Sequence, residues 1–166
     1  DILTPKARKL ISGILAQRET FSQDFQDCLA MCLKDSHSLK YFIDIGAYDG
    51  ITKSNSYALE RAGLLGILVE ANQSLVTQIP QNRAAKILSY AVVPQDIVKE
   101  SLFLSFPKSA RASSAKLVSA SNLNPPEDVR HEVKLISVSN LLEVFRDCFG
   151  KDALSRAYVS IDIEGL

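Results

Sequence analysis

The sequence of 166 residues lacks the features that mark several common protein classes. No apolar run approaches ~18 residues, so the chain predicts no membrane-spanning helix. Nineteen basic residues balance nineteen acidic ones, which gives a formal net charge of +0. Because binding to a polyanion needs a basic surface, this balance argues against nucleic acid as a partner.

Potential metal ligands are also scarce, since the chain has only three cysteines and two histidines. Cys28 and Cys32 lie four residues apart on one face of a predicted helix, a spacing that would suit half of a metal site. No second pair of ligands follows, so we interpret both as small buried apolar residues and predict no metal. The cysteine count suits a reducing compartment, and we expect a cytoplasmic protein.

The residues that are present suffice for one domain with a hydrophobic core, because 46% of them are hydrophobic. Two helices are expected before the first strand, one that starts at Thr4-Pro5 and one at about residues 22–34. We expect residues 1–38 to form an N-terminal helical extension and residues 39–166 to form an α/β domain.

The stretch from Tyr41 to Asn72 predicts a βαβ unit, because parallel strands need such a crossover. Its expected parts are a buried strand at residues 41–45, a glycine turn at 46–50, a helix at about 52–62 and an apolar strand at 65–69. The glycine turn lets the backbone approach a ligand closely, and the helix start behind it presents free N–H groups.

Two carboxylates in this unit suit a nucleoside ligand. Glu70 ends the second strand, where an acidic side chain can accept both hydroxyls of a ribose. Asp44, at the entrance of the turn, can hold an ammonium group. The alternative is a purely structural turn followed by an ordinary exposed glutamate. A dinucleotide fingerprint does not fit, because Tyr48 stands where its second glycine would be, and no P-loop Gly-Lys-Ser/Thr is present.

The segments FIDIGAYDG, SNSYALE and VEAN, with IDIEG near the end of the chain, resemble the FkbM-type family of S-adenosylmethionine-dependent methyltransferases. Tyr48 and Ala71 depart from the Asn and Pro that are typical of that family. The resemblance implies an α/β fold with a Rossmann-like class I methyltransferase sheet, strand order 3-2-1-4 and N-terminal helices. It also implies S-adenosylmethionine as the cofactor.

The donor contacts that follow from the unit and the resemblance are Asp44, Gly46, Ala47, Tyr48, Asp49, Gly50, Ser54, Asn55, Glu70, Ala71, Asn72, Tyr90 and Ala91. Tyr90 and Ala91 belong to a third predicted strand at residues 86–93, whose end passes the adenine ring in the family. Ser54 and Asn55 either bind the carboxylate of the donor or help to end the helix. Asn72 is also expected to cap a short helix at about residues 73–78.

Two further carboxylates, Asp162 and Glu164, lie in a last predicted strand at residues 157–165. Residues two apart on a strand point to the same face, so both can address one site. We assign them to activation or orientation of an acceptor, with the alternative that they hold the following loop. The family suggests a small-molecule or glycan acceptor with a hydroxyl group.

The remaining elements are expected to be strands at residues 101–106 and 132–138 and a helix at 140–149 capped by Ser139. Residues 105–124 predict a loop, either a lid over the substrate or an exposed hairpin connection. The strands after the fourth in a class I sheet are missing. We therefore expect the protein to continue past Leu166, or a partner chain to cover the edge of the fourth strand.

Two alternatives remain to a methyltransferase. One is a non-catalytic nucleotide-binding or scaffolding domain that retains the fold, which Tyr48 and the missing strands favour. The other is a nicotinamide-dependent oxidoreductase, which the sequence of the turn disfavours.

Overall fold

The computed structural model describes residues 20–97, 102–106, 116–119 and 129–163, together with Pro5, Lys9, Ser12 and Gly13. Thr4 and the apolar residues of the first predicted helix lie outside the described residues, as does Glu164. Among the described residues, no helix is long and apolar enough to cross a membrane.

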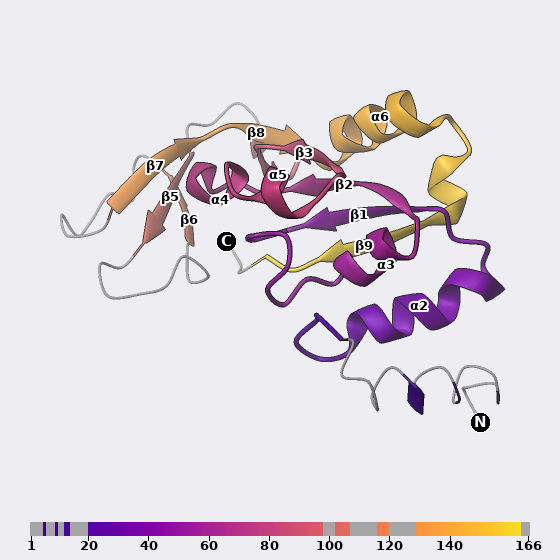
Figure 1. Ribbon diagram of the computed structural model, residues 1–166. Helices are drawn as coiled ribbons and strands as arrows, with labels where there is room; N and C mark the ends of the chain where they lie inside the picture. The colour runs from indigo at the N-terminus through magenta and orange to yellow at the C-terminus, as the bar shows by residue number, and fades with distance from the viewer. Residues whose placement is uncertain are drawn as a thin grey trace.

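The described elements follow one another in a mixed α/β order (Figure 1). They are α2 (Gln26–Ser36), β1 (Tyr41–Ile45), α3 (Tyr57–Arg61), β2 (Leu65–Val69), α4 (Gln73–Val76), α5 (Ile79–Asn82), β3 (Lys86–Leu88), β4 (Ala91–Val93), β5 (Leu102–Phe106), β6 (Lys116–Ser119), β7 (Val129–Val133), β8 (Leu135–Ser137), α6 (Val138–Phe149), the 3₁₀ helix η4 (Ala153–Arg156) and β9 (Ala157–Ile161).

The central sheet has the order β3-β2-β1-β9, and all of its neighbouring strands are parallel. This order confirms the predicted arrangement of the first four core strands. Asp44 pairs with Leu68 on one side and with Ser160 on the other, so it lies in the middle of the sheet near the carboxyl ends of the strands. That edge is where parallel α/β sheets place their ligands.

Apolar side chains alternate between the two faces of this sheet, so each face needs a helical layer to cover it. On one face, Ile43, Ile45 and Ile67 pack with Leu141 and Phe145 of α6. On the other face, Phe42 and Leu68 pack with residues of α2, α3 and α5, namely Ala30, Leu59 and Ile79. Figure 1 shows α6 above the sheet and α2 and α3 below it.

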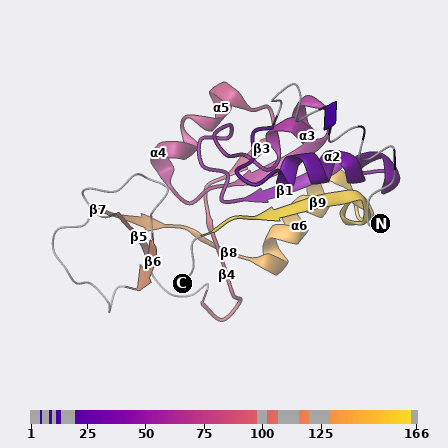
Figure 2. The same cartoon turned by 90° about the horizontal axis from the view of Figure 1, so that it is seen from below.

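A smaller β-region extends from this domain (Figure 2). The third strand predicted at residues 86–93 is in fact two strands, because the chain leaves the central sheet after β3 and β4 pairs in parallel with β8. The strand predicted at 132–138 is likewise divided into β7 and β8. Part of the predicted loop at 105–124 is strand β6, which pairs antiparallel with β5. Residues of these strands form their own apolar cluster: Ala91, Val93, Leu102, Leu104 and Val133.

Three helix predictions need correction at their starts. Helix α3 begins at Tyr57 and not near Thr52, because residues 51–56 form a loop held by side-chain hydrogen bonds. Helix α6 begins at Val138, and its cap is Ser137, whose Oγ accepts from the Asn140 N–H at 3.2 Å.

Helix α2 begins only at Gln26, and two residues expected on its buried face, Phe25 and Leu29, are 51% and 52% exposed. The buried Asp27 carboxylate instead holds the preceding chain. It accepts from the Phe21 N–H at 2.7 Å and from the Ser22 hydroxyl at 2.6 Å. Helix α2 contributes Ala30 and Cys28 to the interior, as expected for Cys28.

Candidate functional site

A cavity of about 330 Å³ opens at the carboxyl ends of β1, β2 and β9, and we call it the strand-end cavity. Its volume falls in the range of about 300–1,000 Å³ that small-molecule sites occupy. It brings together eleven of the residues predicted from the sequence: Asp44, Gly46, Ala47, Tyr48, Ser54, Asn55, Glu70, Ala71, Tyr90, Ala91 and Asp162.

Three predicted contacts do not line the cavity, and each has a structural role. The Asp49 carboxylate accepts from the Ile51 and Thr52 N–H groups at 2.9 and 2.7 Å and so shapes the loop before α3. Asn72 caps α4, as expected, through its Oδ1, which accepts from the Ser74 N–H at 3.0 Å. Gly50 packs against the side chain of Arg83, where a Cβ would lie 2.9 Å from Cγ.

The glycine turn is shaped by close backbone contacts. Gly46 has φ +87°, and a Cβ at this position would overlap the carbonyl oxygen of Asp162. Only glycine therefore lets the chain that leaves β9 pass beside the turn. Tyr48 adopts φ +53°, an uncommon conformation for a residue with a side chain. Its N–H donates to Glu70 Oε2 at 2.9 Å, so the turn and the end of β2 are joined directly.

Glu70 is half-buried and held in place, and is not an ordinary surface glutamate. Its Oε1 accepts from the Asn72 N–H at 2.7 Å, and its Oε2 accepts from Tyr48. Burial raises the pKa of this carboxyl, while these backbone hydrogen bonds act in the opposite direction. The protein therefore fixes this carboxylate at the end of β2, on the wall of the cavity.

Asp44 is 2% exposed in the middle of β1. Its Oδ2 accepts from the Ser56 hydroxyl at 2.5 Å. Burial raises the pKa of Asp44, and the Ser56 hydrogen bond and the charge of Arg83 oppose that rise. A buried carboxyl at the wall of a cavity is costly unless it is partnered, so a cationic ligand group would stabilise it further.

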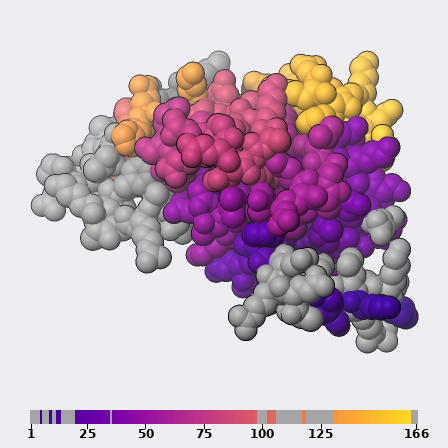
Figure 3. Space-filling view, in the orientation of Figure 1, coloured from indigo at the N-terminus to yellow at the C-terminus, as the bar shows by residue number. Residues whose placement is uncertain are grey.

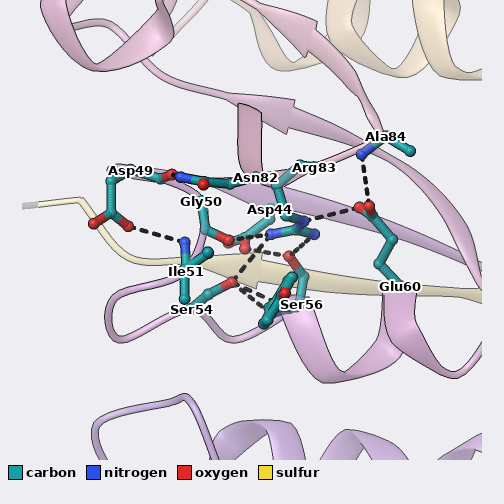
Figure 4. A network of polar contacts seen from close by, with 11 residues as sticks. Asp44, Asp49, Gly50, Ile51, Ser54, Ser56, Glu60, Asn82, Arg83 and Ala84 are labelled. Carbon is teal, nitrogen blue, oxygen red and sulfur yellow. Dashed lines mark hydrogen bonds and ion pairs between the residues drawn. The ribbon is translucent and has the colours of Figure 1, made fainter. Parts of the chain in front are cut away.

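Arg83 organises this side of the site, and sequence reasoning missed it (Figure 4). Its side chain is fully buried and pairs with Glu60 at 2.8 Å. It donates to the Gly50 carbonyl at 2.7 Å and to the Ser56 hydroxyl at 3.0 Å. Its guanidinium also lies over the ring of Phe42, 5.5 Å from the centroid.

These bonds form a continuous chain from Glu60 through Arg83 and Ser56 to Asp44. The network fixes the loop that carries Ser54 and Asn55. No local sequence signal identifies Arg83, because a single arginine after a short helix is typical of a solvated surface.

Ser54 and Asn55 lie on the cavity wall but differ in their bonding. Ser54 Oγ accepts from the Tyr57 N–H at 3.1 Å and so supports the start of α3, which corrects the prediction that it helps to end that helix. Asn55 is 6% exposed and donates through Nδ2 to the Ser160 hydroxyl at 2.9 Å. Its Oδ1 is buried and has no partner among the described residues.

The two carboxylates expected in the last strand are not arranged as predicted. Strand β9 ends at Ile161, and Asp162 lies beyond it as an exposed residue, anchored by its N–H to the Ile45 carbonyl at 2.9 Å. The prediction that Asp162 lies within the last strand is therefore wrong. Glu164 lies outside the described residues.

Two walls of the cavity come from outside the βαβ unit. Gln23, just before α2, reaches it because Ser22 forms a parallel bridge with Lys53. Figure 3 shows the indigo surface of the N-terminal residues against the purple surface of the following segment. Leu104 of β5 and Leu117 of β6 add apolar surface from the smaller β-region.

Among the described residues of the cavity wall, the charged ones are mainly acidic: the carboxylates are Asp44, Glu70 and Asp162, and the cation is Lys53. This balance favours a ligand with positive charge over a pyrophosphate. Among the described residues, no group of three or more His, Cys, Asp and Glu side chains could hold a metal ion.

No protein-family model, curated protein or solved structure matches this chain.

Proposed function

We propose that the strand-end cavity binds S-adenosylmethionine and that residues 39–166 are the donor-binding domain of a methyltransferase, with residues 1–38 as its helical extension. The observation that carries this proposal is the position of Glu70. Its carboxylate is held at the end of β2, beside the glycine turn and on the same cavity as Tyr90 and Ala91. A ribose needs such an acceptor, and a nucleobase needs such a neighbouring strand end.

The residues present fit this donor in charge as well as in position. S-adenosylmethionine carries a sulfonium and an ammonium group, and the cavity wall is acidic. Glu70 would accept the ribose hydroxyls, and Asp44 would face the ammonium group. The unpartnered Oδ1 of Asn55 supplies a further acceptor at the wall.

The bound donor supplies a methyl carbon on a positively charged sulfur, to which an acceptor atom forms a bond as the carbon–sulfur bond breaks and leaves its electron pair on sulfur. The part of this chain is to hold the two reactants in line, which avoids much of the entropic cost of their meeting. Asp162 lines the cavity and is exposed, unlike Asp44 and Glu70. Its carboxylate would take the proton from an acceptor hydroxyl.

The test is thermal unfolding with S-adenosylhomocysteine and, in parallel, with NAD. At ~100 times its dissociation constant a ligand adds about 2.7 kcal/mol of stability, which corresponds to about 5–10 °C for a domain of this size. We expect this shift with S-adenosylhomocysteine and none with NAD. Glu70→Gln should weaken S-adenosylhomocysteine about 10–100-fold, because it removes a charged acceptor of hydrogen bonds.

The matched control is Glu143→Gln, an exposed residue of α6 that does not line the cavity. It should leave the affinity unchanged. A shift with NAD alone, or no shift with either compound, would overturn the proposal.

A second candidate is a domain that binds the donor without transferring its methyl group. It is favoured by one observation, namely that the buried carboxylates of Asp44 and Glu70 are already engaged in hydrogen bonds within the protein. Binding of S-adenosylhomocysteine combined with an absence of methyl transfer to any hydroxylated acceptor would support this candidate.

A further inference from the structure

The two outer strands of the central sheet, β3 and β9 among the described strands, differ in how their edges are protected. An unpaired edge exposes a row of N–H and C=O groups, and proteins commonly protect it by a short strand, by lysine or by proline. Strand β3 has three residues and starts with the exposed Lys86. Strand β9 has five residues and contains neither lysine nor proline. It is therefore the unprotected edge of the sheet.

The pairing of β9 with β1 shows which backbone groups of β9 are left over. The Asp162 N–H donates to the Ile45 carbonyl at 2.9 Å, so the even-numbered residues of this stretch direct their backbone groups toward β1. Successive residues of a strand alternate in direction. The N–H and C=O groups of Ala157, Val159 and Ile161 therefore point away from the sheet, where none of the described strands pairs with them.

The same edge carries apolar side chains that are not covered. Val159 and Ile161 are 47% and 66% exposed. They lie on the face of the sheet that α6 covers, because Val159 pairs with Ile43, which packs against that helix. A strand that paired with the edge of β9 would cover these side chains and satisfy the free backbone groups together.

The opposite face of the sheet offers a charged feature beside the same strand. A hollow of about 310 Å³, which we call the β9 hollow, is lined by the carboxylates of Asp24 and Asp162, with no lysine or arginine among its described lining residues. Arg156 directly precedes β9 and forms no ion pair with any residue in the described part of the chain. An acidic hollow and an arginine without a carboxylate thus lie at opposite ends of one strand.

These features fit a second copy of the same chain. A two-fold axis through Val159, perpendicular to the sheet, places a second β9 antiparallel to the first. The free backbone groups of Val159 then face those of its counterpart, and Ala157 faces the partner's Ile161. Arg156 stands opposite the partner's Asp162, because the two residues are equally far from Val159 in the chain. Opposite charges therefore meet at both ends of the strand pair.

We propose that the free edge of β9 is the interface of a symmetric homodimer, in which two antiparallel β9 strands join the central sheets and each copy places Arg156 against the acidic β9 hollow of the other. The proposal does not depend on which ligand the strand-end cavity binds. Asp162 lines that cavity as well as the hollow. The partner copy therefore adds a positive charge at the border of the candidate site.

The first test is sedimentation equilibrium of the wild-type protein from about 1 µM to about 1 mM, because one short strand pair makes a small and weak interface. The average mass should rise with concentration from that of one chain toward that of two. A mass that stays at one chain over the whole range would overturn the proposal.

Hydrogen exchange resolved by residue tests which backbone groups form the interface. The N–H groups of Val159 and Ile161 should exchange at least about tenfold more slowly when the protein is mostly dimeric than when it is mostly monomeric. Those of Tyr158 and Ser160 point toward β1 and should be protected in both states. If Val159 and Ile161 do not respond while the protein dimerises, the interface lies elsewhere and the proposal is wrong.

A charge placed on the axis should separate the two copies. Val159→Lys sets two lysines side by side and should raise the Kd of the dimer at least about tenfold. Because Val159 is half-exposed, the monomer should stay folded, which urea unfolding checks. Leu65→Lys is the matched control, since Leu65 is 61% exposed but belongs to β2, away from this edge. Equal dissociation constants for the two variants would overturn the interface.

An exchange of charges tests the register. Arg156→Glu should raise the Kd of the dimer about tenfold, because two glutamates then stand opposite two aspartates. The double variant Arg156→Glu/Asp162→Arg exchanges the two charges and should restore the Kd to within about twofold of wild type. A double variant that dimerises as weakly as Arg156→Glu would overturn the antiparallel register.

Discussion

The two sides of the strand-end cavity are built differently. On the side of β1 and β2, Asp44 and Glu70 are fixed by hydrogen bonds to a hydroxyl and to backbone N–H groups. On the side of β9, Asp162 is exposed and is held through its backbone. We call the side of β1 and β2, with Asp44 and Glu70, the fixed side; such a side suits a ligand that always binds in one pose. The β9 side, with the exposed carboxylate of Asp162, suits a ligand whose charge and shape change during a reaction.

The largest expected effect comes from removing the cation that supports the fixed side. Arg83→Met should destabilise the protein by about 3–5 kcal/mol, because it breaks a buried ion pair and leaves the carboxylate of Glu60 without its partner. The pKa of Asp44 should rise further without the guanidinium, and affinity for S-adenosylhomocysteine should fall. Urea unfolding and calorimetric titration measure the two effects.

The control for this change is Arg146→Met on the exposed surface of α6, which should change stability by less than about 0.5 kcal/mol. If Arg83→Met costs no more than Arg146→Met, the network around Arg83 does not support the fixed side.

The two sides meet at Gly46, so Gly46→Ala should have the next largest effect. The left-handed backbone costs about 1–2 kcal/mol for a residue with a side chain, and the overlap with the Asp162 carbonyl adds about 1–3 kcal/mol. Gly63→Ala is the matched control, because Gly63 has φ +88° but no atom within 4 Å of the added Cβ. Its cost should be limited to the backbone strain. Equal losses in the two variants, measured by urea unfolding, would mean that the sides are not in close contact.

The fixed side should also make stability depend on pH. A pKa raised by burial means that the folded state holds the proton of Asp44 more tightly than the unfolded chain does. This contribution is present below the unfolded-state pKa and is lost as pH rises through the folded-state pKa. Asp44→Asn removes the titration, so its free energy of unfolding relative to wild type should increase as the pH rises from about 4, the unfolded-state pKa, by at most about 1.4 kcal/mol per pH unit.

The charged and titratable neighbours of Asp44 decide how large this effect is. Arg83 opposes the raised pKa, while Asp162 reinforces it. The negative charge of Asp44 in turn raises the pKa values of Glu70 and Tyr158. Glu70 also has a raised pKa, and its titration acts in the same direction in both proteins. A difference in the free energy of unfolding that stays constant as the pH rises would show that Asp44 keeps one protonation state.

The same contrast explains which parts of the site could be predicted from the sequence. The side of β1 and β2 is largely local, since a strand, a glycine turn and a strand that ends in Glu70 follow one another within about thirty residues. Short apolar runs indicate the strands, and a glycine between them indicates a turn whose backbone conformation other residues rarely adopt. The two strand predictions are confirmed by β1 and β2, Gly46 has the positive φ expected of the turn, and Gly46 and Glu70 lie on one cavity.

Features that depend on distant partners could not be predicted in this way. Helix α3 starts later than predicted because residues 51–56 form a loop. Arg83 holds this loop, and it lies 29 residues beyond Ser54 in the chain. The run KILSYAVV is equally apolar whether it forms one strand or two. Its division depends on β8, which pairs with β4 from more than forty residues away. The exposure of Asp162 similarly depends on where β9 leaves the sheet, which alternating residue types do not specify.

The smallest change in stability is expected for Asp162, and it separates the two interpretations that the sequence left open. If Asp162 only holds the following loop, Asp162→Asn should lower stability clearly. Because the residue is exposed and anchored by its backbone N–H, we expect a change in stability of less than about 0.5 kcal/mol. Because Asp162 lines the cavity but is exposed, the Kd for S-adenosylhomocysteine should rise less than it does in Glu70→Gln. If Asp162 is the base that we propose, methyl transfer to a hydroxylated acceptor should fall, because the proposed acceptor of the proton is gone. Asp152→Asn, also exposed, is the control for both measurements. A loss of stability greater than that of the control would mean that Asp162 has a structural role. The β9 side of the cavity would then have no base among its described carboxylates.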